Sequence, residues 1–129
     1  MFATSQMAML DVRRSWPSTV LRCLRERLRN LSTSPCAVNE SCTEPAVLVS
    51  AGQIAFPRVA PVTSAFRFVE RYEITHGQIP VRTVEVTTLL VVLATGRTEI
   101  FLDAFGGHGS VSQSSALRLA RILAARARA

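Results

Sequence analysis

The chain has 129 residues, of which 48% are hydrophobic and 19% charged, so it is long enough to bury one hydrophobic core. All 15 of its basic residues are arginine, which excludes lysine Schiff bases and phosphate-loop lysines. Residues 1–31 hold six arginines against two acidic residues, residues 32–103 five against seven, and residues 104–129 four against none. The net charge of +6 therefore lies at the two ends, which favours contact with an anionic partner or with the acidic middle.

Residues 17–31 have the pattern of an amphipathic helix. On a helical wheel, leucine and valine fall on one face, and Arg22, Arg25 and Arg29 fall on the opposite face. Proline is tolerated in the first turn of such a helix, and nearby serines can cap it. The sequence therefore predicts a basic helix that either packs on the rest of the protein or acts as a targeting segment.

The end of this helix resembles the cleavage signals of mitochondrial presequences. In the stretch RNLSTS at residues 29–34, an arginine stands two residues before a bulky apolar residue, and small hydroxyl residues follow. Arginine-rich amphipathic helices that contain serine are typical import signals of mitochondria. The resemblance implies removal of residues 1–31 and a location in the mitochondrial matrix. Without such removal we expect an intracellular, cytoplasmic protein, because the first ten residues lack the pattern of a secretory signal.

Residues 32–45 predict a linker, since serine, threonine, proline and asparagine dominate them without an apolar period. Cys36 and Cys42 lie in this stretch, either as free thiols or joined in a disulfide. Three cysteines without a CxxC pair or a clustered histidine predict no metal site, and no motif predicts a cofactor. We therefore divide the chain into a basic helix (1–31), a linker (32–45) and a single α+β domain (46–129).

Apolar residues predict three strands before the middle of the domain. Residues 46–50 and 53–56 are expected to pair as a short hairpin. Residues 64–74 place aromatic residues on one face, which Glu70 interrupts. Residues 75–78 then predict a turn.

Residues 79–103 contain the longest run of β-branched residues and leucine, and they predict a hairpin buried on at least one face. With Thr95 and Gly96 as the loop, Val91 would lie opposite Ile100 on the core face. The other face is also apolar and needs cover; its members are Leu90, Val92 and Phe101.

The segment after this hairpin is the candidate anion site. Gly107, His108, Gly109 and Ser110 join a strand to a helix, an order that leaves backbone N–H groups free to hold a phosphate or carboxylate. The spacing matches neither a P-loop nor a dinucleotide fingerprint. The alternative is a flexible connector whose glycines supply positive φ and whose serines cap the helix.

Residues 114–129 predict a helix, because alanine, leucine and arginine are strong helix formers. Its alanine-rich face would pack on the sheet or on a second copy of the helix. Arg118, Arg121 and Arg128 cluster on the opposite face.

Together these elements predict an α+β fold: an antiparallel β-meander of three to five strands, with an N-terminal basic amphipathic helix and a C-terminal helix packed on the sheet. A homodimer through the second sheet face would cover its apolar residues. No stretch has the ~20 apolar residues that a membrane-spanning helix needs.

We expect a non-enzymatic protein, because the sequence contains no recognisable carboxylate pair, metal cluster or nucleophile with its base. The hypothesis is a small interaction or regulatory protein that self-associates through its sheet. Its arginine-rich helices would contact an anionic partner, with nucleic acid as the leading candidate. The alternatives are a mitochondrially imported protein with a cleaved presequence, and an overprinted reading frame without defined activity, which the absence of lysine would fit.

Overall fold

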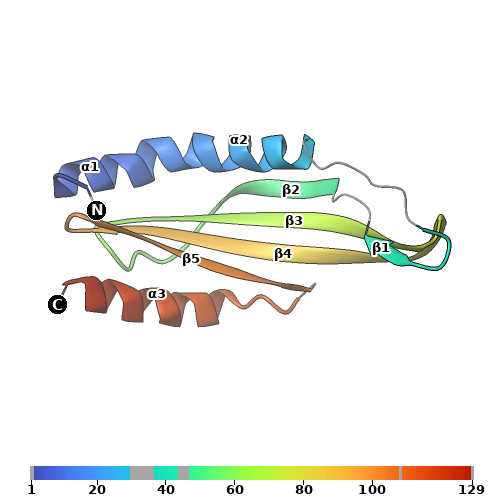
Figure 1. Cartoon of the computed structure of the whole chain (residues 1–129). Helices are drawn as coiled ribbons and strands as arrows, with labels where there is room; N and C mark the ends of the chain where they lie inside the picture. The colour runs from blue at the N-terminus through green and yellow to red at the C-terminus, as the bar shows by residue number, and fades with distance from the viewer. Residues whose placement is uncertain (1, 30–36, 44–46, 108, 129) are drawn as a thin grey trace.

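Within the residues that the computed structural model describes (2–29, 37–43, 47–107 and 109–128), five antiparallel strands form one sheet. Helices lie along both of its faces, which makes three layers (Figure 1). The predicted α+β fold class, with an N-terminal helix and a C-terminal helix on an antiparallel sheet, is confirmed. The elements are α1 (Ser5–Leu10), η1 (Asp11–Ser15), α2 (Trp16–Arg29), β1 (Ser41–Thr43), β2 (Val47–Ile54), β3 (Val62–His76), β4 (Ile79–Thr95), β5 (Thr98–Gly107) and α3 (Gln113–Arg128).

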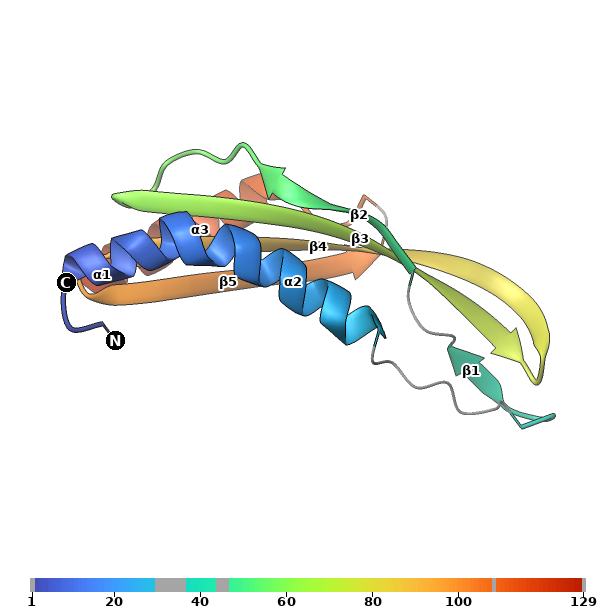
Figure 2. The ribbon, with the colours of Figure 1, turned by 90° about the horizontal axis from the view of Figure 1, so that it is seen from above.

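The long hairpin of β3 and β4 is the centre of the sheet. Its strands have 15 and 17 residues, β5 pairs with the free side of β4, and both β1 and β2 pair with β3. The two chain ends lie at one end of the sheet, and the tip of the hairpin lies at the other end (Figure 2). Gly77 has a φ of +58° in this tip, a conformation that glycine adopts without the steric cost of a side chain.

The predicted hairpin of residues 46–50 and 53–56 is wrong. Val47–Ile54 form one strand, β2, which pairs with β3 from Val47 opposite Arg71 to Ile54 opposite Ala65. The register shifts between Leu48 and Ser50. Pairing along the whole length of β2 satisfies more backbone groups than two short strands could satisfy between themselves.

The predicted register of the β4–β5 hairpin is also wrong. Thr95 pairs with Thr98, so the loop residues are Gly96 and Arg97, and Val91 lies opposite Leu102. Gly96 has a φ of +56°, as glycine does at the first loop position of type II′ hairpin turns. Because cross-strand partners move by two residues, every side chain stays on its predicted face.

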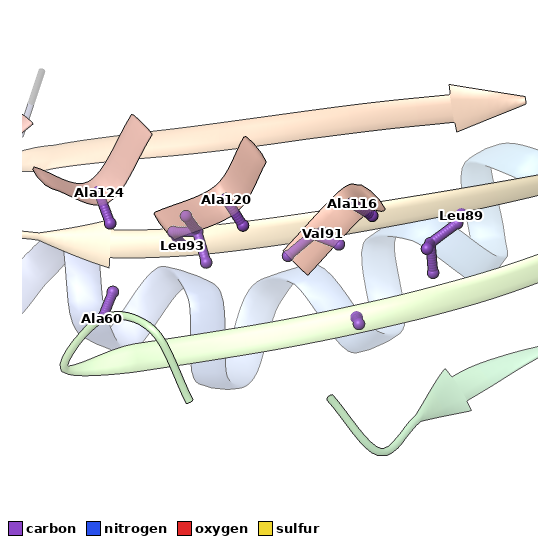
Figure 3. Packing of buried hydrophobic residues seen from close by; sticks show 8 residues of the cluster. Ala60, Leu89, Val91, Leu93, Ala116, Ala120 and Ala124 are labelled. Carbon is purple, nitrogen blue, oxygen red and sulfur yellow. The ribbon is translucent and has the colours of Figure 1, made fainter. Parts of the chain in front are cut away.

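The C-terminal helix packs on one face of the sheet through three alanines. Ala116, Ala120 and Ala124 are spaced one turn apart, are buried, and point at the β4 residues Val91 and Leu93 (Figure 3). Small side chains let the helix backbone come close to the sheet, as the sequence predicts. The remaining buried members of this core are Ala60, Ala65 and Leu89.

The N-terminal helix is longer than the sequence predicts. It begins at Ser5, where the Thr4 hydroxyl accepts a 3.2 Å hydrogen bond from the Met7 N–H. Between α1 and α2, one π-helical turn joins the two helices, with the Trp16 N–H donating to the Asp11 carbonyl. Pro17 follows directly. Proline has no N–H to donate and its ring crowds the preceding turn, so the wider π-helical turn accommodates it.

This helix covers the second face of the sheet. Ala8 and Val12 are buried there, and half-buried Trp16, Val20, Leu21 and Leu24 pack on the same core. The sheet contributes Val62, Phe66, Phe68, Val92 and Ala94, with half-buried Leu90 beside them. Leu90 and Val92 are therefore covered by the chain itself rather than by a second copy, and Phe101 stays 67% exposed on β5.

The division of the chain at residues 31 and 45 stays a prediction, because both boundaries lie outside the described residues. Within the stretch predicted as a linker, residues 41–43 form β1, which pairs with the end of β3. Cys42 is disulfide-bonded and Cys23 is an exposed free thiol, whereas Cys36 lies outside the described residues.

Candidate anion-binding surfaces and a buried carboxylate

The arginines of α3 form the first candidate surface. Arg118, Arg121, Arg126 and Arg128 are exposed, and the helix contains no acidic residue. In the described part of the chain, no carboxylate lies within ion-pair distance of these guanidinium groups. Arg128 is turned back toward its own helix, since its Nε donates a 3.2 Å hydrogen bond to the Ala124 carbonyl. This leaves Arg118, Arg121 and Arg126 as cations that face solvent.

The arginines of α2 form the second candidate surface. Arg22 and Arg25 are exposed, as are Arg13 and Arg14 in the π-helical turn before them. Arg29 ends α2, but its side chain lies outside the described part of the structure. Because α2 and α3 lie on opposite faces of the sheet, the predicted arginine residues make two separate surfaces rather than one (Figure 1).

Three arginines outside the helices, Arg58, Arg71 and Arg97, donate hydrogen bonds to other residues. Arg71 forms an ion pair with Glu85, its residue opposite on β4, with Nη2 at 2.8 Å and Nε at 3.2 Å from Oε1. Arg58 donates to the carbonyls of Ala60 and Pro61. Of the strand arginines, Arg71 is paired with a carboxylate, whereas Arg67 and Arg82 are exposed on β3 and β4.

The glycine-rich segment after β5 closes on itself. The Ser110 N–H and hydroxyl both donate to the Gly107 carbonyl, at 3.0 and 2.7 Å. Gly109 has a φ of +77°, and Ser112 rather than Ser114 caps α3, because its hydroxyl accepts the Ser115 N–H. His108 lies outside the described residues. The Ser110 N–H, one of the backbone donors that the predicted anion site would use, is therefore engaged in the turn.

A small polar cluster anchors the N-terminal helix to β5. The Trp16 indole N–H donates to the Glu99 carboxylate, next to Asp11. Burial raises the pKa of Glu99, the hydrogen bond from Trp16 opposes that rise, and the neighbouring Asp11 carboxylate adds to it. The role of this cluster is structural, since it links η1 and α2 to the edge of the sheet.

Glu70 is the functional candidate that sequence reasoning missed. It lies on β3 at the α2 face, is 6% exposed, and receives a 2.9 Å hydrogen bond on Oε2 from the Tyr72 hydroxyl. Its Oε1 is buried and has no hydrogen-bond partner in the described structure. It lines a cavity of ≈ 160 Å³ together with Leu24, Phe68, Thr88, Leu90 and Asp103. The sequence signal was the single acidic residue in an otherwise apolar strand face.

Within the described residues, no group of three or more His, Cys, Asp or Glu side chains is placed to hold a metal ion. None of the described helices has the length and apolar character to cross a membrane. No protein-family model, curated protein or solved structure matches the chain.

Proposed function

We propose that this chain is a small non-enzymatic interaction or regulatory protein that contacts an anionic partner, most readily nucleic acid, through the arginines of its helices. The observation that carries the proposal is the exposed arginine face of α3, which has no carboxylate within ion-pair distance in the described structure. Guanidinium groups bind phosphate through paired hydrogen bonds, and a row of them on one helix can follow a phosphate backbone without reading its sequence.

Two basic surfaces on opposite faces give this proposal a specific form. A single short duplex can contact α2 or α3 but not both, because the sheet stands between the helices. The protein would therefore join two anionic segments, or bind one of them on each face. Such binding depends on released counterions and weakens as salt concentration rises.

The test is a salt titration of binding to a short DNA duplex, with the wild-type chain and the double variant Arg118→Gln, Arg121→Gln. We expect the variant to lower the slope of log Kobs against log salt by about 2, since each lost phosphate contact lowers it by about 0.9. The matched control is Arg67→Gln with Arg82→Gln, which removes the same charge from exposed strand positions. The proposal fails if the wild-type chain does not bind at low salt, or if both double variants change the slope equally.

Self-association is the second part of the proposal, now through the edge of the sheet. β5 is an edge strand whose outer side has no strand partner among the described residues. Phe101 and Phe105, four residues apart on the same face of this strand, are 67% and 76% exposed. Long exposed edges with apolar side chains favour pairing with another strand.

We expect sedimentation analysis to show a dimer that the substitutions Phe101→Ser and Phe105→Ser convert to a monomer. Ile122→Ser, which removes a half-exposed apolar side chain from α3 instead, is the control and should leave the dimer intact. A wild-type monomer at every concentration tested would remove self-association from the proposal.

If the protein is instead imported into mitochondria, its N-terminal helix would be removed. Removal of residues 1–31 would take away the side chains that cover Phe66 and Val92. The packing of this helix supports its retention, and with it the arginines of α2. An overprinted frame without defined activity would instead show no salt-dependent binding of the kind described above.

A further inference from the structure

The exposed side chains at the edge of β5 are arranged symmetrically about Asp103. Phe101 stands two positions before it and Phe105 two positions after it, so all three lie on the same face of the strand, and all three are exposed. This is the α2 face of the sheet, because Phe101 lies opposite Val92 and Asp103 lies opposite Leu90. A symmetric edge of this kind can meet its own copy about a two-fold axis, the commonest symmetry of protein dimers.

Every second residue of β5 turns its backbone toward the free edge. The β4–β5 hairpin closes with a two-residue loop, so Thr98 is hydrogen-bonded to β4, and bonded positions then alternate along the ladder. The odd-numbered residues in 99–107 therefore direct their N–H and C=O groups away from β4. The Gly107 carbonyl fits this alternation, since the Ser110 N–H donates to it from outside the ladder. No strand in the described part of the chain pairs with this side, so a strand from a second copy can.

A groove beside the middle of β5 leaves room for such a strand. Ala104 and Phe105 line it from β5, and Ser115 and Leu119 line it from α3. Leu119 is one of the exposed apolar side chains of the helix. A strand paired with β5 would therefore lie beside α3 as well.

The two phenylalanines select one register. Two copies of β5 related by a two-fold axis perpendicular to the sheet run antiparallel and keep the same faces. With the axis at Asp103, Phe101 of each copy lies opposite Phe105 of the other, and cross-strand aromatic pairs stabilise a sheet. An axis at Leu102 or Ala104 would instead place a phenylalanine opposite Asp103. An axis at either phenylalanine would pair that residue with itself and leave the other opposite a residue outside β5.

The favoured register brings two like charges together. Asp103 lies on the axis opposite its own copy, and the Cα atoms of a hydrogen-bonded antiparallel pair are about 5.5 Å apart. Like charges directly opposite each other destabilise a strand pair. Around Asp103 lie Leu24 of α2, Leu90 of β4 and the Glu70 carboxylate of β3. In the described structure no guanidinium group lies within ion-pair distance of Asp103 to offset its charge.

We propose that, in the self-association put forward above, two β5 strands pair antiparallel about a two-fold axis at Asp103, and that repulsion between the two Asp103 carboxylates weakens this pairing. The paired strands continue the sheet from one copy into the other. Because the axis is perpendicular to the sheet, both α2 helices lie on one face of the dimer and both α3 helices on the other. Each face then presents the exposed arginines of two helices to an anionic partner.

The role of Asp103 is tested by the dissociation constant of the dimer, measured by analytical ultracentrifugation for the wild type, Asp103→Asn and Glu73→Gln. Both substitutions remove one exposed carboxylate, but only Asp103 lies at the axis. Because the chain already carries a net charge of +6, loss of an acidic residue elsewhere would not strengthen association. We expect Asp103→Asn to tighten the dimer about three- to tenfold, because it removes a pair of like charges, and Glu73→Gln not to tighten it. Equal tightening by both variants would overturn the role of Asp103.

The register is tested by cross-linking two chains through introduced thiols. In a chain whose exposed free thiol is removed by Cys23→Ser, Asp103→Cys places two thiols opposite each other, at a Cα separation that a disulfide spans. We expect mild oxidation to join these chains into covalent dimers on a non-reducing gel. Ala104→Cys, which keeps both phenylalanines, is the matched control and should not cross-link, because residue 104 lies opposite residue 102. Cross-linking of the control instead of Asp103→Cys would overturn the register.

The same measurements separate this proposal from the self-association on which it rests. A wild type that stays monomeric while Asp103→Asn dimerises would remove self-association from the proposed function and support the role of Asp103. A dimer with the same dissociation constant in the wild type and in Asp103→Asn would support self-association and overturn the role of Asp103. Monomers of both chains at every concentration would overturn both.

Discussion

A chain that starts at Ser32 is expected to lose the native fold. The helices α1 and α2 cover Val62, Phe66, Phe68 and Val92, which are buried in the full chain. Full exposure of one such side chain costs about 1.5–3 kcal/mol, and the stability of a whole domain is about 5–15 kcal/mol. Exposing four of them therefore removes most or all of that stability. Urea denaturation followed by circular dichroism is the measurement, and we expect no cooperative transition.

The control for this truncation keeps the helix and removes charge from it. The full chain with Arg22→Gln and Arg25→Gln should unfold within about 0.5 kcal/mol of the wild type, since both side chains are exposed. A large loss of stability in the truncated chain, with little change in the arginine variant, would show that the helix stabilises the fold through its apolar face. A truncated chain that unfolds cooperatively, with near wild-type stability, would instead support a removable presequence.

The strands of the central sheet could be predicted because β-branched and aromatic residues are concentrated in them. Residues 64–74 and 79–103 contain most of β3, β4 and β5, and both of their turns contain a glycine with positive φ. The alanine face of α3 was equally clear, since Ala116, Ala120 and Ala124 recur at one turn of a helix. In these stretches local propensity and tertiary packing favour the same structure.

The errors arose where tertiary contacts decide. The sequence predicted the N-terminal helix only from residue 17, yet residues 5–15 are helical as well, with Ala8 and Val12 buried against the sheet. Likewise β2 contains Gly52 and reads as two short pieces, but the long neighbour β3 offers it a continuous ladder. The loop of the β4–β5 hairpin lies one residue further along the chain than predicted, because glycine occupies the first position of the turn rather than the second.

Some properties of the candidate site residues could likewise be predicted from the sequence, and others could not. That the helical arginines are exposed follows from amphipathic spacing and could be predicted. The positions of α2 and α3 on opposite faces could not be predicted, because no local sequence pattern determines which face of the sheet each helix packs on. Glu70 stood out in the sequence as an interruption, but only the packing of α2 shows that it is buried beside a cavity.

The two cores that these helices form with the sheet are expected to stabilise the fold independently of each other. Phe66 is fully buried under α1 and α2, and Leu93 is fully buried under α3. We expect Phe66→Ala to lower the free energy of unfolding by about 3–5 kcal/mol and Leu93→Ala by about 2–5 kcal/mol. Because the side chains point to opposite faces of the sheet and belong to separate clusters, the effects should add within about 0.5 kcal/mol. Urea denaturation of both single variants and of the double variant measures this.

If the two destabilisations add, the N-terminal helices and α3 each stabilise the sheet independently of the other. If the double variant is too unstable to measure, Phe66→Leu with Leu93→Val tests the same point with smaller cavities, because each change removes fewer buried atoms. A small effect of Phe66→Ala beside a large effect of Leu93→Ala would mean that the sheet is stable under α3 alone. The N-terminal helix would then be free to leave the sheet, and the arginines of α2 could act apart from the folded core.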